Sequence, residues 1–192
     1  AAFIPMISKL KSKASAQDFA AKTFSILFFS LALLTTLAQI FMPGLIWLLA
    51  SGFAEDTEKF DLAVQLTRIT FGYLLFISLV SLLGGVLNSL NKFAAAAAAP
   101  FLLNLTLIGS LLLFADKAET PAHALSWGVF VAGIVQFVWL YMACIKNDFQ
   151  IKLGLPKISP EIKTLLKRML PVMLGAGVLQ INVLINTQIA SH

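Results

Sequence analysis

The residues with the clearest chemical potential are polar side chains inside long apolar segments. Thr70, Ser81 and Asn88 are separated by eleven and seven residues, which at about 100° per residue places them within about 20° of one another on a helix. Polar groups in lipid are costly, so this face is predicted to avoid lipid. It is either a helix–helix seam, in which hydroxyl and amide groups bond across the interface, or the wall of a hydrated cavity. Both interpretations stay open.

Three further polar residues lie in or beside apolar segments. Arg68 falls opposite that stripe, near the end of its segment. We expect its long side chain to snorkel to the headgroups, with a substrate contact as the alternative. Asn104 and Gln136 are isolated in apolar surroundings and fit either a cavity or a helix seam.

The last apolar segment is polar on two sides. Asn182 and Asn186 are one helical turn apart and share a face, while Gln180 and Thr187 lie on a nearly opposite face. This pattern favours a central position between two helix bundles, although helix–helix hydrogen bonding explains it too. The candidate cavity residues are therefore Arg68, Thr70, Ser81, Asn88, Asn104, Gln136, Gln180, Asn182 and Asn186.

Enzymatic chemistry has no visible support in the sequence. There is no acid–base dyad, phosphate-binding loop or metal-ligand cluster, so neither a cofactor nor a metal is expected. His123 lies at a loop edge and His192 at the end of the sequence, and neither has a predicted site around it. Cys144 is the single cysteine, which excludes a disulfide within the chain and a cysteine zinc cluster.

Composition indicates the elements that must position these residues. Of 192 residues, 59% are hydrophobic and 12% are charged, about half the charge of an average soluble domain. An apolar helix of about 20 residues crosses the hydrocarbon core, and lipid-exposed backbone must be helical. The prediction is an all-α polytopic transmembrane bundle of about five spans, because five windows lack charge: 23–54, 69–91, 93–115, 120–145 and 169–191.

The charged residues divide by loop rather than forming one nucleic-acid-binding face. Lysines cluster in residues 1–22, at Lys92 and in residues 146–168, whereas the other two loops are mainly acidic. The positive-inside rule then places the basic segments in the cytoplasm. We predict four units. Residues 1–22 form the end of a preceding helix and a basic connector, and residues 23–145 form four spans. Residues 146–161 form a linker, and residues 162–192 form one more span.

Several ordered motifs closely resemble one transporter family. They are Leu66–Leu79, Gly84–Ser89 with Asn91-Lys92-Phe93, Pro100–Asn104, Leu125–Gly128, and Met169-Leu170-Pro171 with Gln180–Asn182. Together they resemble the MviN/MurJ family of lipid II flippases. The resemblance implies fourteen helices in two lobes, of which this chain would cover the end of the second helix through the seventh. Gly72 stands where the family often has proline, and Ala94–Ala99 replaces a proline and an aromatic residue.

The resemblance also implies a function. We expect a fragment of a flippase that moves undecaprenyl-linked peptidoglycan precursor, lipid II, across the bacterial cytoplasmic membrane by alternating access. The implied partners are lipid II, the bilayer and the remaining helices. The family's diphosphate-binding arginines lie on helices outside this chain. The alternatives are another exporter of the same superfamily, for polysaccharide precursors or drugs, and a membrane scaffold that transports nothing.

Overall fold

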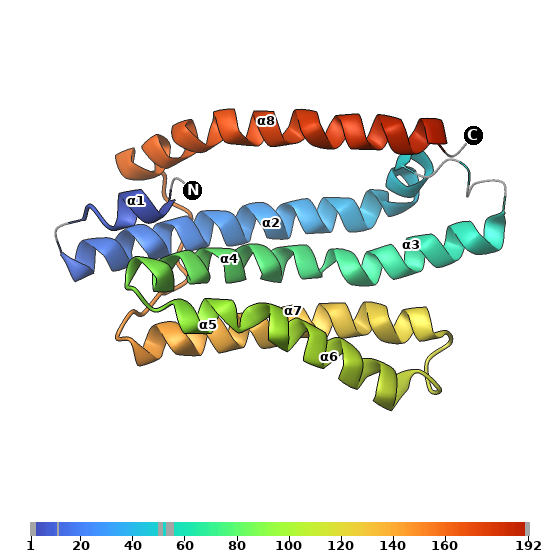
Figure 1. Ribbon diagram of the computed structural model, residues 1–192. Coiled ribbons are helices and arrows are strands. Elements are labelled where there is room, and N and C mark those ends of the chain that lie inside the picture. The colour runs from blue at the N-terminus through green and yellow to red at the C-terminus, as the bar shows by residue number, and fades with distance from the viewer. Residues whose placement is uncertain (1–2, 11, 50–51, 53–55, 191–192) are drawn as a thin grey trace.

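The computed structural model describes residues 3–10, 12–49, 52 and 56–190, without the side chains of residues 178, 179 and 181–190. Within these ranges the regular structure is entirely helical, which confirms the predicted all-α class. The helices form an elongated bundle (Figure 1). In chain order they are α1 (Phe3–Ile7), α2 (Lys13–Leu49), α3 (Thr57–Phe71), α4 (Tyr73–Ser89), α5 (Phe93–Ala97), α6 (Ala99–Phe114), α7 (Pro121–Lys146) and α8 (Pro160–Ala190).

The first four predicted spans are confirmed by length and composition. Among the described residues, four helical stretches are long and apolar enough to cross a membrane: Lys13–Leu49, Thr57–Ser89, Phe93–Phe114 and Pro121–Lys146. The fifth predicted span corresponds to α8, which has 31 residues. Much of its apolar part lies where side chains are not described, so the fifth span stays a prediction.

Two of these spans consist of two helices each. Gly72 separates α3 from α4, and a Cβ atom there would lie 2.6 Å from the Phe130 ring. Glycine therefore allows the Phe130 side chain of α7 to lie close against this junction. Ala98 separates α5 from α6, and Pro100 lies in the first turn of α6. Proline has no N–H for the preceding turn and so favours a new helix start at this point.

The turns at one end of the bundle use left-handed residues. Asn91 and Asp148 have φ angles of 59° and 55°, a conformation that asparagine and aspartate tolerate better than most residues. Directly after Asn91, the N–H of Lys92 donates to the carbonyl of Leu87 at 2.9 Å. At the end of α7, directly after Asp148, the N–H of Phe149 donates to the carbonyl of Cys144 at 2.9 Å. These bonds satisfy carbonyls that would otherwise be left unpaired at a helix end.

At the opposite end, helices begin with polar caps. Asp56 caps α3 by accepting a hydrogen bond from the Lys59 N–H at 3.2 Å, and bonds from Lys59 hold the pKa of Asp56 below its ordinary value. Thr120 caps α7 by accepting from the His123 N–H at 3.4 Å. Such caps fix where the spans leave the loops.

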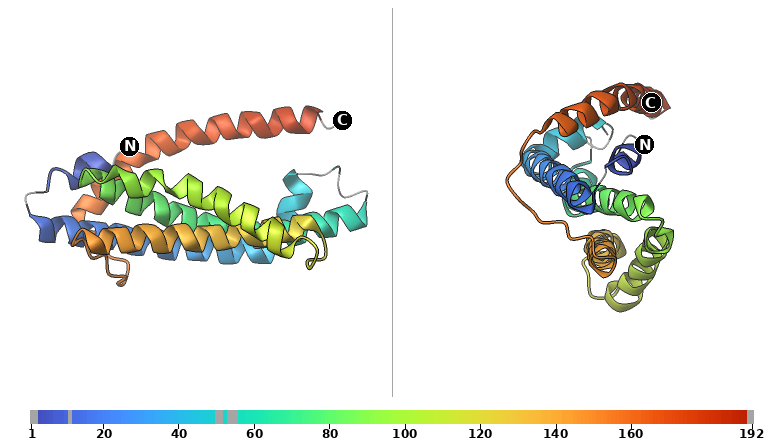
Figure 2. Two further views of the ribbon diagram at one scale, coloured as in Figure 1. Left: turned by 60° about the horizontal axis from the view of Figure 1, so that its bottom comes forward. Right: turned by 90° about the vertical axis from the view of Figure 1, so that its left-hand side faces the viewer.

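The basic connector predicted for residues 1–22 is mostly helical. Helix α2 begins at Lys13, because Ser12 Oγ accepts a hydrogen bond from the Ser15 N–H at 3.1 Å and so caps the first turn. The last turns of α2 bend away from its axis (Figure 2), and the helix contains Pro43, a residue type that commonly kinks helices.

The packed core is concentrated toward the end where α2 begins. Its larger cluster joins α1, α2, α4, α7 and the segment after α7, with Leu83 and Leu87 fully buried. A smaller cluster, which includes Met42 and Val64, joins α2 to α3. The other end of the bundle therefore has less apolar packing to hold its helices together.

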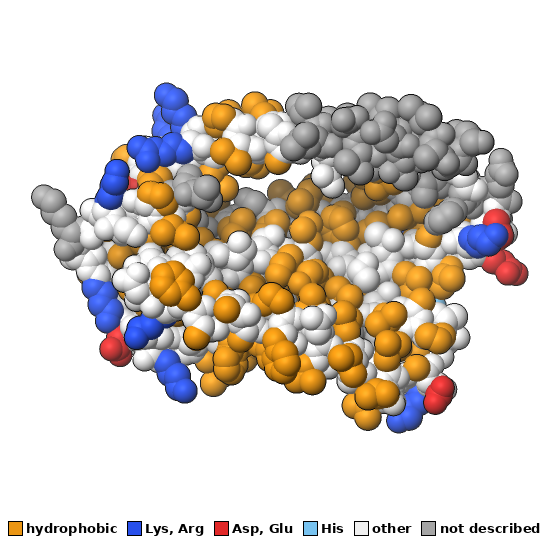
Figure 3. Space-filling view, viewed as in Figure 1, with side chains coloured by type: hydrophobic (Ala, Val, Ile, Leu, Met, Phe, Trp, Pro, Cys, Tyr) orange, Lys and Arg blue, Asp and Glu red, His pale blue; other side chains and the backbone are white. Residues whose placement is uncertain are grey.

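The outer surface has the polarity of a membrane protein. Large apolar side chains are widely exposed, with Ile40 at 63% and Leu112 at 80%. In Figure 3, Lys and Arg side chains gather at the end where α2 begins, and Asp and Glu side chains gather mainly at the other. An apolar belt between two charged ends suits a bilayer.

Helix α8 is docked at its beginning only, as far as its side chains are described. Ile162 and Leu165 are buried in the larger cluster, whereas residues 166–177 are exposed. The segment leading to α8 is held against the bundle, because the Gly154 N–H donates to Ser25 Oγ at 3.0 Å and the Tyr141 hydroxyl donates to the Ile151 carbonyl at 3.2 Å. Beyond its first turns, α8 runs apart from the other helices (Figure 1).

Candidate functional site

One face of α4 carries small polar side chains and is largely uncovered. Ser81 is exposed, and Ser78 and Asn88 are half-buried, whereas Leu79 and Leu83 on other faces are 1% and 0% exposed. The uncovered positions fall within a sector of about 80° around the helix axis. We call this face the open stripe; it consists of Leu74, Ser78, Ser81 and Asn88.

The open stripe faces the concave side of the helix arrangement. Gly85 lies in the same sector of α4, and a Cβ atom there would lie 3.3 Å from the Phe3 ring of α1. The right-hand view of Figure 2 shows the helices as an arc, with α1 on its inner side between α8 and α4. The surface is hollowed below α8 (Figure 3). Hydroxyl and amide groups on this side can bond water or a polar ligand.

Thr70 and Arg68 belong to α3 and are not part of this uncovered face. Thr70 is half-buried, and its hydroxyl donates to the Leu66 carbonyl at 2.9 Å. The Ser78 hydroxyl of the open stripe makes the same kind of bond, to the Leu74 carbonyl at 2.8 Å. Arg68 is exposed and lines a separate pocket between α3, α6 and α7. The structure therefore does not bring the one arginine of this region to the open stripe.

Gln136 lies in a helix–helix seam rather than on an open surface. Its side-chain N–H donates to the Ala99 carbonyl at 2.7 Å, and its amide oxygen accepts from the Tyr73 hydroxyl at 3.3 Å. The residue is 1% exposed. Gly133, one turn earlier, touches the Tyr73 ring so closely that a Cβ atom would lie 2.8 Å from it. We call this junction of α4, α6 and α7 the Gln136 seam; it consists of Tyr73, Ala99, Gly133 and Gln136.

The remaining candidate residues are spread over α6 and α8. Asn104 is exposed on α6, and Gln180 is exposed on α8. Asn182 and Asn186 lie where side chains are not described, so their proposed cavity role is not examined by the structure. The open stripe belongs to α4 alone. Candidate residues on other helices, such as Asn104 on α6, are therefore not part of it.

Three residues have surroundings that the sequence did not reveal. Ser78 belongs to the open stripe, and its position three residues before Ser81 was the available signal. The Tyr73 hydroxyl donates to the Gln136 side chain of another helix at 3.3 Å. The sequence predicted no site around His123, yet its ring nitrogens lie 3.0 Å from Thr120 Oγ1 and 3.3 Å from Gln65 Oε1. No sequence pattern indicated this last contact.

Comparison with known proteins decides the family. Residues 1–192 match the family model described as "Lipid II flippase MurJ". The chain belongs to the MurJ family. It is 40% identical over 198 residues to the "Probable lipid II flippase MurJ" of Rhizobium tropici, covering 100% of this chain and 37% of that protein. The probable lipid II flippase MurJ of Rickettsia prowazekii is also 40% identical, over 98% of this chain and 38% of its own length.

The resemblance seen in the motifs is thus confirmed for the whole chain. The lipid II flippase MurJ of Burkholderia cenocepacia is 33% identical over 100% of this chain and 38% of its own length. The chain therefore spans less than two-fifths of the length of these MurJ relatives. With its four apolar spans, it is a multi-pass membrane segment of a bacterial family.

Proposed function

We propose that this chain forms one wall of the translocation cavity of a lipid II flippase in the bacterial cytoplasmic membrane. The observation that carries the proposal is the open stripe, which presents Ser78, Ser81 and Asn88 on the concave side of an otherwise apolar span. The names of its relatives support lipid II as the substrate. The protein is proposed to move this lipid without chemical change, as a transporter and not as an enzyme.

The chemistry of the open stripe suits a neutral part of the cavity. A diphosphate-linked headgroup is strongly hydrated, and polar groups that replace water lower the cost of drawing it into the membrane. Hydroxyl and amide groups serve this purpose, but a diphosphate also needs cations. The open stripe itself contains none. We propose that the remaining helices of the complete protein supply them.

The proposed orientation follows the distribution of charge. Residues 1–22, Lys92 and residues 146–168 would face the cytoplasm, and the acidic loops would face outward. Cysteines placed at Ser15 and Thr164 should then react with impermeant thiol reagents from the cytoplasmic side only, and one at Thr57 from the outside only. Labelling of the Thr57 position from the cytoplasm would reverse the topology.

The position of α8 bears on how the transporter would alternate its access. We propose that residues 23–145 belong to one lobe, that residues 146–161 link the lobes and that α8 begins the second. Transporters of this kind alternate their access by rocking one bundle against another around a central site. An α8 docked at its beginning and otherwise apart from α4 fits a boundary between two such bundles.

The decisive experiment uses Asn88 in the complete protein that carries this sequence. Asn88→Leu should abolish rescue of cells depleted of their lipid II flippase while protein abundance stays normal, and Asn88→Gln should restore rescue because it keeps the amide. If Asn88 instead supports only packing, Asn88→Leu lowers abundance. Normal rescue by Asn88→Leu at normal abundance would contradict the cavity role.

A further inference from the structure

A second concave site lies between α3, α6 and α7, at the end of the molecule that carries the α6–α7 loop. It is a pocket of about 1010 Å³ between α3, α6 and α7. Both α3 and α6 pack against α7, so the pocket fills the space that separates them. Its walls are mostly apolar and include Ile69, Leu113, Trp127 and Val131.

The pocket is bounded by close contacts on two sides. Between α6 and α7, the Ser110 hydroxyl donates to the Ala124 carbonyl at 2.5 Å, and a Cβ atom at Gly128 would lie 2.8 Å from Ser110 Cβ. Between α3 and α7, His123 Nε2 lies 3.3 Å from Gln65 Oε1. These contacts fix the walls, so the pocket is part of the packed arrangement of three helices.

The depth of the pocket matches one leaflet of a membrane. Its lining runs from Thr106 to Phe114 on α6 and from His123 to Val131 on α7, which is about 12 Å along each helix at 1.5 Å per residue. Half of a hydrocarbon core of about 30 Å is about 15 Å. A further membrane-crossing helix would need the full thickness, whereas an acyl chain of one leaflet needs only this half.

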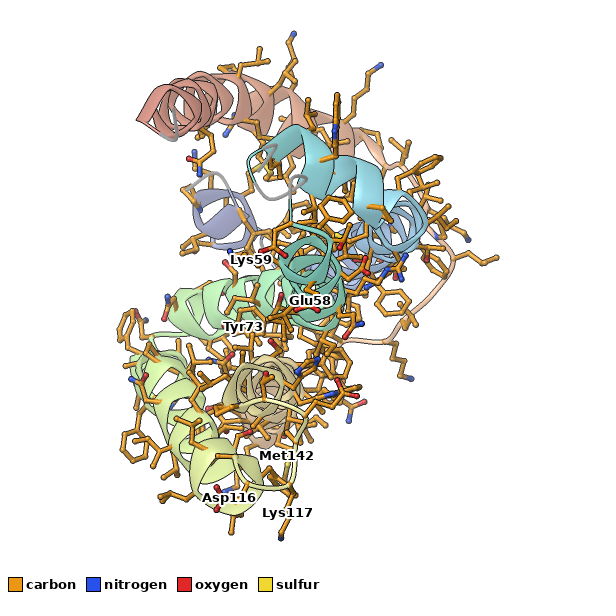
Figure 4. All side chains as sticks on the ribbon, turned by 90° about the vertical axis from the view of Figure 1, so that its right-hand side faces the viewer. Glu58, Lys59, Tyr73, Asp116, Lys117 and Met142 are labelled. Carbon is orange, nitrogen blue, oxygen red and sulfur yellow. The ribbon has the colours of Figure 1, made fainter. Side chains whose placement is uncertain are left out.

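The mouth of the pocket carries two cations. Arg68 and Lys117 both line it, and no ion pair of either is found among the described residues. Figure 4 shows Lys117 beside Asp116 just beyond the end of α6. The carboxylate of Glu119 lies 3.5 Å from His123 Nε2. An arginine and a lysine that line one pocket can both donate hydrogen bonds to a phosphate group.

We propose that this pocket holds an anionic glycerophospholipid from the leaflet at the α6–α7 loop end. One acyl chain lies between α3 and α6, and the phosphate contacts Arg68 and Lys117. The lipid fills the weakly packed end of the bundle and holds α3 at a fixed distance from α6. This site is separate from the open stripe and does not depend on the transported substrate.

The test uses the complete protein in nanodiscs that contain phosphatidylglycerol with a photoreactive acyl chain. Crosslinks should map to peptides that contain residues 106–114 and 123–131. Phosphatidylcholine with the same chain should crosslink about tenfold less, because the positive charge of its choline group offsets the attraction between its phosphate and the two cations. Arg68→Gln combined with Lys117→Gln should remove that tenfold preference.

A plug variant tests the pocket itself. Gly109 lines the pocket, and a Cβ atom there would meet nothing within 4 Å, so Gly109→Leu should block the acyl chain and abolish the crosslinks. Gly175→Leu on α8, where a Cβ atom also meets nothing within 4 Å, is the matched control and should leave them unchanged.

Three outcomes would overturn the proposal. The first is equal crosslinking of the two lipids in the unmodified protein, and the second is crosslinking that survives Gly109→Leu. The third is an absence of crosslinks to both peptides in the unmodified protein together with lowered abundance of Gly109→Leu, which would show that another segment of the protein fills the pocket. The double glutamine variant changes surface residues only, so it remains informative if Gly109→Leu fails to fold.

Discussion

The Gln136 seam, at the junction of α4, α6 and α7, and the open stripe, on another face of α4, use similar polar groups for different purposes. In the seam, Gln136 is 1% exposed and both ends of its amide are hydrogen-bonded to other helices. On the open stripe, Ser81 is exposed, and no hydrogen bond of its side chain is found among the described residues. Polarity alone therefore does not identify a cavity. What matters is whether the protein itself already satisfies the polar group.

The largest effect is expected from overfilling the seam. Gly133→Leu places a Cβ atom 2.8 Å from the Tyr73 ring and 3.0 Å from Phe76 Cβ, and overpacking of this kind costs about 3 kcal/mol. Thermal unfolding of the purified complete protein should show a strongly lowered midpoint, and Gly175→Leu should not. An unchanged midpoint for Gly133→Leu would show that α4 and α7 are not packed as described.

A smaller loss of stability is expected from removing the seam's hydrogen bonds. Gln136→Leu leaves the Tyr73 hydroxyl and the Ala99 carbonyl without this partner, and each interhelical bond in a membrane contributes about 0.6 to 2 kcal/mol. Protein abundance should fall. Asn104→Leu, at an exposed position, serves as the comparison and should lower it less. Equal losses for the two variants would erase the distinction between seam and surface.

The smallest effect on stability is expected at the open stripe, where accessibility is the sharper measurement. Ser81→Cys should leave abundance unchanged and react readily with a small hydrophilic thiol reagent. Leu82→Cys, at a neighbouring position that is 8% exposed, should react much more slowly. If both thiols stay unreactive in the complete protein, the stripe is covered by another helix and the cavity role is lost.

Much of the fold could be predicted because lipid imposes a simple rule. Charge-free windows of about 20 residues mark helices, and each of the four spans overlaps one of the first four windows. The third and fourth agree within one residue at each end, whereas the first two helices begin 10 and 12 residues before their windows. The division of a span at Gly72 could not be predicted in the same way. There the Phe130 ring of α7 packs against a glycine, and Phe130 is 58 residues away in the sequence.

The candidate site was only partly predictable for a similar reason. Helical periodicity places Ser81 and Asn88 on one face of α4, and it does so from local sequence alone. It cannot tell that Gln136 finds its partners on α4 and α6, because those contacts depend on how helices cross. Likewise, the pocket beside Arg68 arises from the separation of α3 and α6, which no single segment encodes.

In the proposed rocking of the lobes, the buried beginning of α8 would be the pivot about which this helix turns. Ile162 and Leu165 fix its foot at 1% and 3% exposure, and its 31 residues extend about 46 Å at 1.5 Å per residue. A rotation of about 10° at the foot would displace the far tip by about 8 Å, on the scale of a helix diameter. In the proposed rocking of two lobes, a small repacking around these two side chains would therefore produce a large displacement at the far end of α8.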